Sequence, residues 1–543
     1  MTKHQNTRKT SHQQLRSTAF IAAFFLSIAS APGAYSAGGA YDQLSSGTEQ
    51  ITIPAPDPSA AGLADQLPTK SAGRESLRII RMNDEAIAAT TPDQKIQMLK
   101  TLMRDSQPNN NNNDTTDWDQ KDVEKNIMRI LQSAQDAADF DYVYYRLDKG
   151  DLERSVGWYK DVRDLVNKYR GTVVPGDWDG LAKYVNTVAK AVDSGRNLIK
   201  FLIDGKDVMK EAGEALATAQ KSIHIEIFQL QSDNIGKGLA SILTAKAHEG
   251  VKVRVLIDKH GSRLDDDPEL IKMIDKMRAS GITILLKKTP FLASHLDHRK
   301  VVVIDGHIGF TGGMNIGRWY QVEWHDQQTL IVGPAVTELQ KAFVEQWKIA
   351  KGTFEPNEDL FPVLEEYPGG SDTQVITHLG WGDQNIKAVY LRAIGTAQKS
   401  IRIANPYFTD MDVVNALRGA ASRGVKVQVI LPQDNDMAIV RHASRHNYPK
   451  MVKSGVQIYE YKGRMAHEKV AVIDGRWSTF GSSNLDERSF KNNDELNLIV
   501  TDPAVVQDIE TRLFDADLPN CELMNNYDPG ILDHMAHMVD GSL

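Results

Sequence analysis

Two short patterns of histidine, lysine, aspartate, glycine and asparagine recur in this 543-residue chain with identical internal spacing. The residues of the two copies are His298, Lys300, Asp305, Gly312 and Asn315, and then His467, Lys469, Asp474, Gly481 and Asn484. Two imidazoles can divide the roles of nucleophile and general acid, and lysine and amide groups can bind phosphoryl oxygens. The patterns therefore predict one phosphodiester site that draws on both copies.

Each pattern begins an apolar run that is typical of a buried strand. His298 and Lys300 lie two residues apart, and residues two apart on a strand point to the same face. The same holds for His467 and Lys469, so each pair can face one phosphate. We expect a pseudo-twofold pairing of the copies, because one histidine cannot attack and protonate from opposite sides.

Metal binding is the alternative explanation for the paired histidines. A His-x-Lys spacing places a cation beside each supposed ligand, and the chain contains neither a cysteine pair nor a His-Glu-x-x-His sequence. We therefore expect no metal site and no cofactor. The single cysteine, Cys521, is expected to be a free thiol or a link between chains, and not a catalytic nucleophile.

An internal repeat surrounds the two patterns. The sequence Thr-Ala-Gln-Lys-Ser-Ile at 218–223 recurs letter for letter at 396–401, and Gly-Val-Lys-Val at 250–253 recurs at 424–427. In each half we expect a strand, a helix and three further strands, of which the last carries the histidine pattern. The expected strands are 223–228, 253–258, 282–286, 301–305, 401–404, 427–431, 456–461 and 470–474, with helices at 239–248 and 413–421.

Composition divides the rest of the chain. Basic residues followed by an apolar stretch at 19–31 are typical of a signal peptide, with cleavage after Ala31 or Ser36, and an uncleaved membrane anchor is the alternative. We therefore expect export to the periplasm or the medium. The expected divisions are a signal peptide at 1–36, a flexible leader at 37–75, a helical extension at 76–199, repeat domains at 200–352 and 374–543, and a linker at 353–373.

The net charge of the chain argues against one class of partner, nucleic acids. The net charge is −8, with 25% charged and 41% hydrophobic residues, which is ordinary for a globular protein. A general nucleic-acid binder usually carries a basic footprint instead. We therefore expect no nucleic-acid partner.

The chain resembles the phospholipase D superfamily, whose hallmark is a pair of His-x-Lys-x4-Asp motifs. Within it the resemblance is strongest to bacterial cardiolipin synthases, and it covers about residues 200–520. It is carried by the segments 298–317, 324–326, 332–336, 481–490 and 494–497. The resemblance implies an α/β fold of two pseudo-twofold-related phospholipase D-like α/β/α sandwich domains, preceded here by the helical extension.

The resemblance also implies a metal-independent, two-step phosphatidyl transfer through a phosphohistidine. It implies that His298 is the nucleophile and His467 the acid and base. It further implies that Lys300, Lys469, Asn315 and Asn484 bind phosphoryl oxygens, and that Asp305 and Asp474 orient the histidines. Ser482 joins the phosphate-binding set, whereas Gly313 takes its place in the first motif and has no hydroxyl.

The resemblance leaves the acceptor open. Because the chain has a signal-like segment in place of the transmembrane helices of many relatives, we favour a phospholipase D that hydrolyses glycerophospholipids and transfers to water or an alcohol. The alternatives are a cardiolipin synthase-type phosphatidyltransferase, a nuclease of the superfamily, and a lipid-binding scaffold with an inactive site. The expected partner is a phospholipid, with peripheral membrane contact, and the oligomeric state stays open.

Overall fold

The computed structural model describes residues 79–80, 82–105, 120–133, 143, 173–187, 189–288, 295–380 and 384–537. The expected signal peptide and leader lie outside these residues. Within the expected helical extension the structure has α3 (Asp84–Ala88), α4 (Pro92–Asp105), α5 (Gln120–Gln132) and α9 (Trp178–Thr187). Their buried side chains include Leu99 and Ile127, and the same cluster includes Ala388 of the second repeat.

The repeats supply the strands of one 15-stranded sheet. The strands of the first repeat are β1 (Val192–Ile203), β2 (Ser222–Ile227), β3 (Lys252–Asp258), β4 (Thr283–Lys287), β5 (Lys300–Ile304), β6 (Ile308–Gly312) and β7 (Gln327–Val332). Those of the second are β8 (Ser371–His378), β9 (Ser400–Ala404), β10 (Lys426–Pro432), β11 (Gln457–Tyr461), β12 (Val470–Ile473), β13 (Trp477–Gly481), β14 (Glu495–Val500) and β15 (Cys521–Leu523).

The order of the strands shows the pseudo-symmetry directly. The sheet runs β15-β11-β10-β9-β12-β13-β14-β8-β1-β7-β6-β5-β2-β3-β4. β1 and β8 form the central antiparallel pair of the sheet. From this pair outward, equivalent strands follow in the same order in both repeats: β7, β6, β5, β2, β3 and β4 on one side, and β14, β13, β12, β9, β10 and β11 on the other. The β5 and β12 strands, which follow the two histidines, occupy matching positions.

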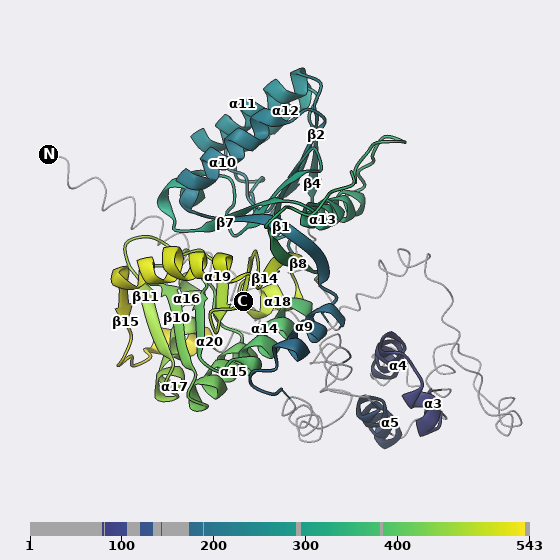
Figure 1. The fold of residues 1–543 in the computed structure, drawn as a ribbon, viewed down its shortest axis with the longest axis vertical. Coiled ribbons are helices and arrows are strands. Elements are labelled where there is room, and N and C mark those ends of the chain that lie inside the picture. The colour runs from purple at the N-terminus through teal and green to yellow at the C-terminus, as the bar shows by residue number, and fades with distance from the viewer. Residues whose placement is uncertain are drawn as a thin grey trace, which may run out of the picture. The chain divides into compact units, whose positions relative to one another are not determined.

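Helices cover both faces of the first repeat, with α10–α12 on one side of its strands and α13 on the other (Figure 1). The helical elements of this repeat are α10 (Asp204–Thr218), α11 (Asn234–His248), α12 (Pro268–Ala279), the π-helix η2 (Trp319–Glu323) and α13 (Ala335–Ile349). Those of the second repeat are α14 (Asn385–Thr396), α15 (Met411–Ser422), α16 (Ala438–His446), α17 (Tyr448–Lys453), α18 (Glu487–Lys491), α19 (Pro503–Ile509), η3 (Glu510–Asp515), η4 (Leu518–Asn520) and α20 (Ile531–His537).

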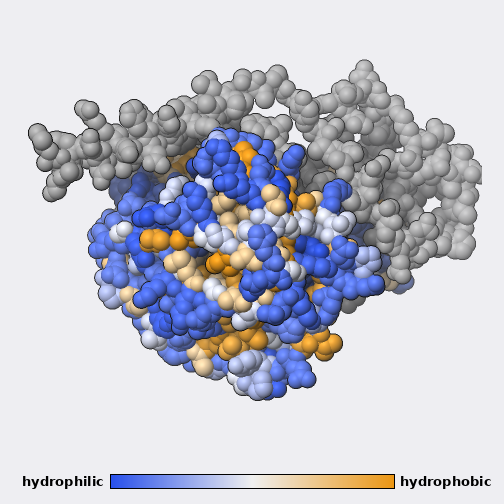
Figure 2. All heavy atoms as spheres, turned by 90° about the horizontal axis from the view of Figure 1, so that it is seen from above, coloured by the Kyte–Doolittle hydropathy of each residue, from blue (hydrophilic) through white to orange (hydrophobic). Residues whose placement is uncertain are grey.

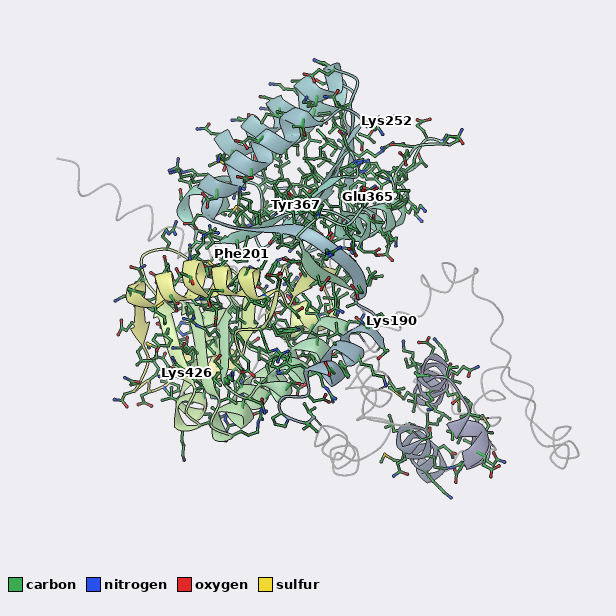
Figure 3. The ribbon with its side chains drawn as sticks, viewed as in Figure 1. Lys190, Phe201, Lys252, Glu365, Tyr367 and Lys426 are labelled. Atoms are coloured by element: carbon green, nitrogen blue, oxygen red, sulfur yellow. The ribbon has the colours of Figure 1, made fainter. Side chains whose placement is uncertain are left out.

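A shared apolar core joins the two repeats. The Phe201 ring of β1 meets the Phe480 ring of β13 edge to face at 5.3 Å, and Figure 3 labels Phe201 where the two halves meet. Val301 and Val303 of β5 belong to the same cluster as Val470 of β12. Alternate residues of both strands are therefore buried between the repeats, which fixes how the residues before each strand face one another.

The eight expected strands and two expected helices are present, with ends that differ by at most five residues from the expected ones. The sequence did not predict β1, β6 and β7 of the first repeat or β8, β13, β14 and β15 of the second. Among these, β1, β6 and β13 mix polar or glycine residues into their apolar runs. No helix of the described residues is long and apolar enough to cross a membrane. One face of the molecule is mostly hydrophilic, with apolar side chains gathered in patches (Figure 2).

Candidate active site

Each motif histidine is held by the other repeat. The backbone N–H of His298, just before β5, donates to the Asp494 carbonyl at 3.0 Å, and its Nδ1 lies 2.9 Å from Glu495 Oε1 at the start of β14. In the same way His467 donates its backbone N–H to the His325 carbonyl at 2.7 Å, and its Nδ1 lies 2.7 Å from Asp326 Oδ2. The structure thus brings both histidines into one site at the junction of the repeats.

The carboxylates set the tautomer of both rings. A carboxylate accepts a hydrogen bond, so Nδ1 carries the proton and Nε2 keeps its lone pair, which is the form a nucleophile or base requires. Burial lowers the pKa of His298 and of His467 well below the ordinary value, and the ammonium groups of Lys300 and Lys469 lower both further. Both rings are therefore neutral in the free site.

The two lysines lie beside the histidines of their own motifs. Lys300 Nζ donates to the His298 carbonyl at 2.5 Å, and Lys469 Nζ donates to the His467 carbonyl at 2.6 Å. Burial lowers the pKa of Lys300 to about 7 and that of Lys469 to about 8, against the opposite effect of the nearby carboxylates. A bound phosphodiester anion would replace the missing counter-charge and favour both ammonium forms.

Burial also raises the pKa of the two supporting carboxyls. Asp326 and Glu495 are completely enclosed, and the pKa of each is raised to about 7. Lys469 is the strongest opposing charge for Asp326, and Lys300 is the strongest for Glu495. The site is thus two histidine, lysine and carboxylate sets, each made from both repeats.

Gly313 and Ser482 occupy equivalent positions in the two motifs, but they contact the carboxylates of Asp326 and Glu495 in different ways. Ser482 Oγ donates to Glu495 and accepts a hydrogen bond from the Leu496 N–H at 3.0 Å. A Cβ at Gly313 would lie 2.5 Å from Asp326 Oδ1. The absence of a side chain at Gly313 therefore makes room for Asp326, whereas Ser482 supports Glu495. Phosphate binding by Ser482 stays a prediction.

Asn315 and Asn484 are both buried near the turns that follow β6 and β13. Asn315 Oδ1 accepts a hydrogen bond from the Gln229 N–H at 3.1 Å. Asn484 Oδ1 has no hydrogen-bond partner among the described residues. Phosphate binding by the two amides stays a prediction.

Asp305 and Asp474 do not orient the histidines, which corrects the expected role. Asp305 accepts hydrogen bonds from the backbone N–H groups of residues 220, 221 and 222 at 2.7–2.8 Å, and Asp474 does the same for residues 398–400. Both residues have a positive φ, 53° and 54°, and each is followed by a glycine with positive φ, which makes a type I′ hairpin turn. They lie at the far end of the strand, about 20 Å along the chain from the histidines.

The sequence contained a signal for the missed carboxylates. Asp326 and Glu495 each follow the first glycine of their motif by fourteen residues. They lie in the segments 324–326 and 494–497, which carry the family resemblance but imply no role for either carboxylate. The register of the repeat is enough to identify Asp326 and Glu495 as equivalent residues. Their contacts with the histidines of the opposite repeats depend on how the two halves assemble.

Aromatic rings and one further cation complete the surroundings. The Phe228 ring lies edge-on to His298 at 4.9 Å, and the Tyr320 and Trp324 rings lie 5.6 Å and 4.9 Å from His467. The guanidinium of Arg488 adds to the effect of the lysines on the pKa of His298. These walls are apolar, as expected of a site that limits the access of water.

Cys521 is free in the single chain and only partly buried. Burial and the neighbouring Asp517 raise the pKa of its thiol to about 12. The thiol is therefore protonated near neutral pH and is a poor nucleophile.

Comparisons with known proteins agree with the repeat and the site. Residues 213–347 and 390–517 match the family described as "Cardiolipin synthase, PLD-like domain". The probable cardiolipin synthase YwiE of Bacillus subtilis (strain 168) is 30% identical over 418 residues, which are 72% of this chain and 83% of that protein. The cardiolipin synthase of Geobacillus sp. (strain WCH70) is 36% identical over 335 residues, 58% of this chain and 65% of the relative.

A solved structure extends the likeness to the whole two-domain fold. The phosphatidylserine synthase of Haemophilus influenzae Rd KW20 superposes with a TM-score of 0.53 at 16% identity, covering 67% of this chain and 99% of that one. At this identity the likeness concerns the fold alone, and it confirms the expected α/β fold of two phospholipase D-like domains. With both repeats matched by sequence, the chain belongs to the cardiolipin synthase branch of the phospholipase D superfamily.

Proposed function

We propose that this chain transfers a phosphatidyl group from one glycerophospholipid to the hydroxyl group of another, as a cardiolipin synthase-type enzyme. One observation carries the proposal: two histidines, each held by a carboxylate of the opposite repeat, share a buried site with two lysines. A nucleophile and an acid on one phosphodiester need this pairing.

In the first step His298 Nε2 attacks the phosphorus, and the phosphorus–oxygen bond to the head-group alcohol breaks. His467, protonated when the anionic substrate is bound, gives its proton to the leaving oxygen. Glu495 offsets the positive charge that develops on the phosphorylated ring of His298 through its Nδ1–H. Lys300 and Lys469 are placed to bind the non-bridging oxygens.

In the second step His467 takes the proton of the acceptor hydroxyl. The acceptor oxygen attacks phosphorus, the phosphorus–nitrogen bond breaks, and His298 is regenerated. With phosphatidylglycerol as donor and acceptor, the products are cardiolipin and glycerol. The choice of His298 as nucleophile rests on the family resemblance alone.

Synthesis is favoured over the hydrolysis that the sequence first suggested. Relatives that are 30–37% identical are named cardiolipin synthases. The aromatic rings of Phe228, Tyr320 and Trp324 stand against the two histidines, where they would hinder water more than a lipid hydroxyl. Hydrolysis is then a side reaction. A nuclease is disfavoured by the acidic net charge.

The transfer itself needs no metal in this proposal, because Lys300 and Lys469 supply the positive charge at the phosphate. Peripheral membrane contact is supported by the η2 helix. Its Trp319 and Val322 are 37% and 48% exposed, and the adjoining Tyr320 and Trp324 contact His467. Export of the chain stays a prediction, which N-terminal sequencing of the mature protein would test.

The full chain can be tested with vesicles of phosphatidylglycerol and lipid mass spectrometry. We expect cardiolipin and glycerol in equal amounts, little phosphatidic acid, and neither product with His298→Ala. Phosphatidic acid as the main product would favour a hydrolase. Cleavage of plasmid DNA without lipid turnover would favour a nuclease, and no product from any substrate would favour a scaffold.

A further inference from the structure

A second cluster of buried ionisable groups lies directly behind the His467 side of the active site. Its centre is formed by three residues, His325, Glu468 and Asp517, all buried, whose nearest nitrogen and oxygen atoms lie within 4.8 Å of one another. His325 precedes Asp326 in the chain, and Glu468 lies between His467 and Lys469. Since side chains alternate along a strand, Glu468 points away from the phosphate site and into this cluster.

The imidazole of His325 is surrounded by carboxylates. Its Nε2 lies 2.8 Å from Glu468 Oε1 and 3.0 Å and 3.1 Å from the two oxygens of Asp517. One N–H group cannot donate to three oxygens. The other ring nitrogen, Nδ1, lies 2.8 Å from Asp204 Oδ1, and Arg464 lies 2.8 Å from the second oxygen of Asp204.

Glu468 is the member of the cluster whose carboxylate oxygens lack hydrogen bonds in the described part of the chain. It is 1% exposed, and neither of its carboxylate oxygens makes a hydrogen bond among the described residues. A buried carboxylate without hydrogen bonds is costly, and native proteins normally pair it or use it to coordinate a metal. Its Oε1 makes an ion contact with His325 Nε2 at 2.8 Å.

The charges of the cluster do not balance without a further cation. The three carboxylates, Asp204, Glu468 and Asp517, surround the imidazole of His325, and the permanent cation Arg464 pairs with Asp204. If a divalent ion replaces the Nε2 proton of His325, the ion and Arg464 together neutralise all three carboxylates.

The equivalent cluster of the first repeat provides an internal comparison. There Arg299 stands at the position of Glu468, and Asp494 stands at the position of His325. Arg299 binds Glu226 at 2.8 Å, and Lys287 contacts Asp494 and Asp297. The cations of these contacts are a guanidinium and an ammonium, which do not coordinate a metal ion in their protonated forms, whereas the carboxylates of the second repeat's cluster face an imidazole.

We propose that His325, Glu468 and Asp517 form a binding site for a divalent transition-metal ion, for which Zn²⁺ is the best match. Imidazole nitrogen together with carboxylate oxygen suits zinc better than calcium or magnesium, which prefer oxygen alone. Tetrahedral zinc places its ligand atoms about 3.3 Å apart. The distances from His325 Nε2 to the oxygens of Glu468 and Asp517 are 2.8–3.1 Å, so they need to lengthen by only a few tenths of an ångström. The three side chains supply one ligand atom each, and a water molecule would complete four ligands.

The outer contacts of the cluster suit the same assignment. A histidine that binds metal usually donates its other N–H to a carboxylate, and Asp204 stands in that position, fixed in turn by Arg464. The ion would join the start of β7 in the first repeat to the start of β12 in the second. It would therefore brace the segments that carry Asp326 and His467 without touching the phosphate, so the ion is structural.

The three ligands form no recognisable metal motif in the sequence, because they lie far apart along the chain. The chain also offers a competing histidine cluster at its C-terminal end, where His446 stacks on His537 at 4.0 Å and lies 5.0 Å from His534. The test must separate the two. Untagged, full-length protein is needed, since an affinity tag would bind zinc itself.

The first measurement is the metal content of the wild-type protein after loading with Zn²⁺ and gel filtration. We expect about one tightly held zinc ion per chain, and a thermal midpoint that falls by several degrees on removal with a chelator and returns on adding Zn²⁺. Co²⁺ in its place should give the visible absorption of a four-coordinate site. Wild-type protein that holds no zinc and shows no shift with Zn²⁺ would overturn the proposal, whatever the variants do.

Three variants locate the ion. Glu468→Gln should lose the zinc and the zinc-dependent shift. The matched control Glu226→Gln changes a buried carboxylate of the equivalent cluster and should keep the zinc. His446→Ala should also keep it. Loss of the ion in His446→Ala, with retention in Glu468→Gln, would assign the metal to the C-terminal histidines and refute the proposal.

Discussion

Asp326 Oδ2 lies 2.7 Å from Nδ1 of His467, a residue 141 positions further along the chain and in the other repeat. Glu495 repeats this relationship with His298 in the opposite direction. Each motif histidine therefore lacks its carboxylate partner until both repeats have folded against one another. The duplicated motif is a pair of half-sites whose supporting carboxylates are exchanged.

Replacing the supporting carboxylate should damage chemistry more than binding. In Asp326→Asn the amide NH2 can donate to Nδ1, which would leave the proton on Nε2 and present the wrong tautomer. We expect kcat to fall about a thousandfold, with a small change in KM, by analogy with the loss when a histidine loses its orienting carboxylate. Initial rates on phosphatidylglycerol vesicles measure both constants. A fall of less than tenfold would contradict the assignment.

The two histidines should fail as a unit. His298→Ala and His467→Ala should each abolish turnover nearly as fully as the double variant, because residues that act on one transition state are not additive. The comparison requires all three proteins to melt near the wild-type temperature. Retention of about a tenth of the activity in either single variant would argue against one shared site.

Asp305 and Asp474 should behave differently from Asp326, although all are acidic residues linked to the motifs. Each holds three backbone N–H groups beside a hairpin turn. In Asp305→Asn the new side chain is compatible with the positive φ, but one of the two carboxylate oxygens that accept backbone hydrogen bonds is lost. We therefore expect the free energy of unfolding to fall by about 1–3 kcal/mol. Urea titration measures this. Activity per folded molecule should stay within a few-fold of wild type, and a catalytic collapse would restore the role first expected.

The contrast between these aspartates shows how far the sequence could reach. Spacing and alternation were enough to predict the duplicated α/β halves and the placement of His298 with Lys300 on one face. They did not distinguish a carboxylate that faces the histidine of the opposite repeat from one that caps a distant turn. That distinction depends on the pairing of β14 with β8 and of β7 with β1 across the middle of the sheet. The partners Asp326 and Glu495 come together only through contacts between repeats.

The pH profile should be a narrow bell. Asp326 and Glu495 support the histidines only when ionised, and their pKa values are raised to about 7, so activity should fall as the pH drops below 7. The lysines bind phosphate only when protonated. Their pKa values are lowered to about 7 and about 8, so kcat/KM should fall as the pH rises through this range. The basic limb of kcat should lie at higher pH, because the bound anion favours the ammonium forms.

Ser482→Ala gives a directed change to that profile. The Ser482 hydroxyl donates to Glu495 and helps to keep its pKa down, against burial. Its removal should shift the acidic limb upward in pH and leave the basic limb in place. Gly313→Ala is the matched variant of the other repeat, where the added Cβ would collide with Asp326 and lower kcat at every pH. An unchanged acidic limb in Ser482→Ala would show that ionisation of Glu495 does not control the rate.

Added glycerol should drive the proposed reaction backward. Conversion of two phosphatidylglycerol molecules into cardiolipin and glycerol breaks one phosphodiester bond and forms another of the same kind, so its equilibrium constant should be close to one. Because the phosphohistidine can be discharged by whichever hydroxyl reaches it, cardiolipin supplied with excess glycerol should give phosphatidylglycerol. Mass spectrometry with deuterated glycerol would show the label in the product. Phosphatidic acid at a rate that glycerol does not alter would instead mean that water discharges the intermediate, and the chain would then be a hydrolase on the same catalytic residues.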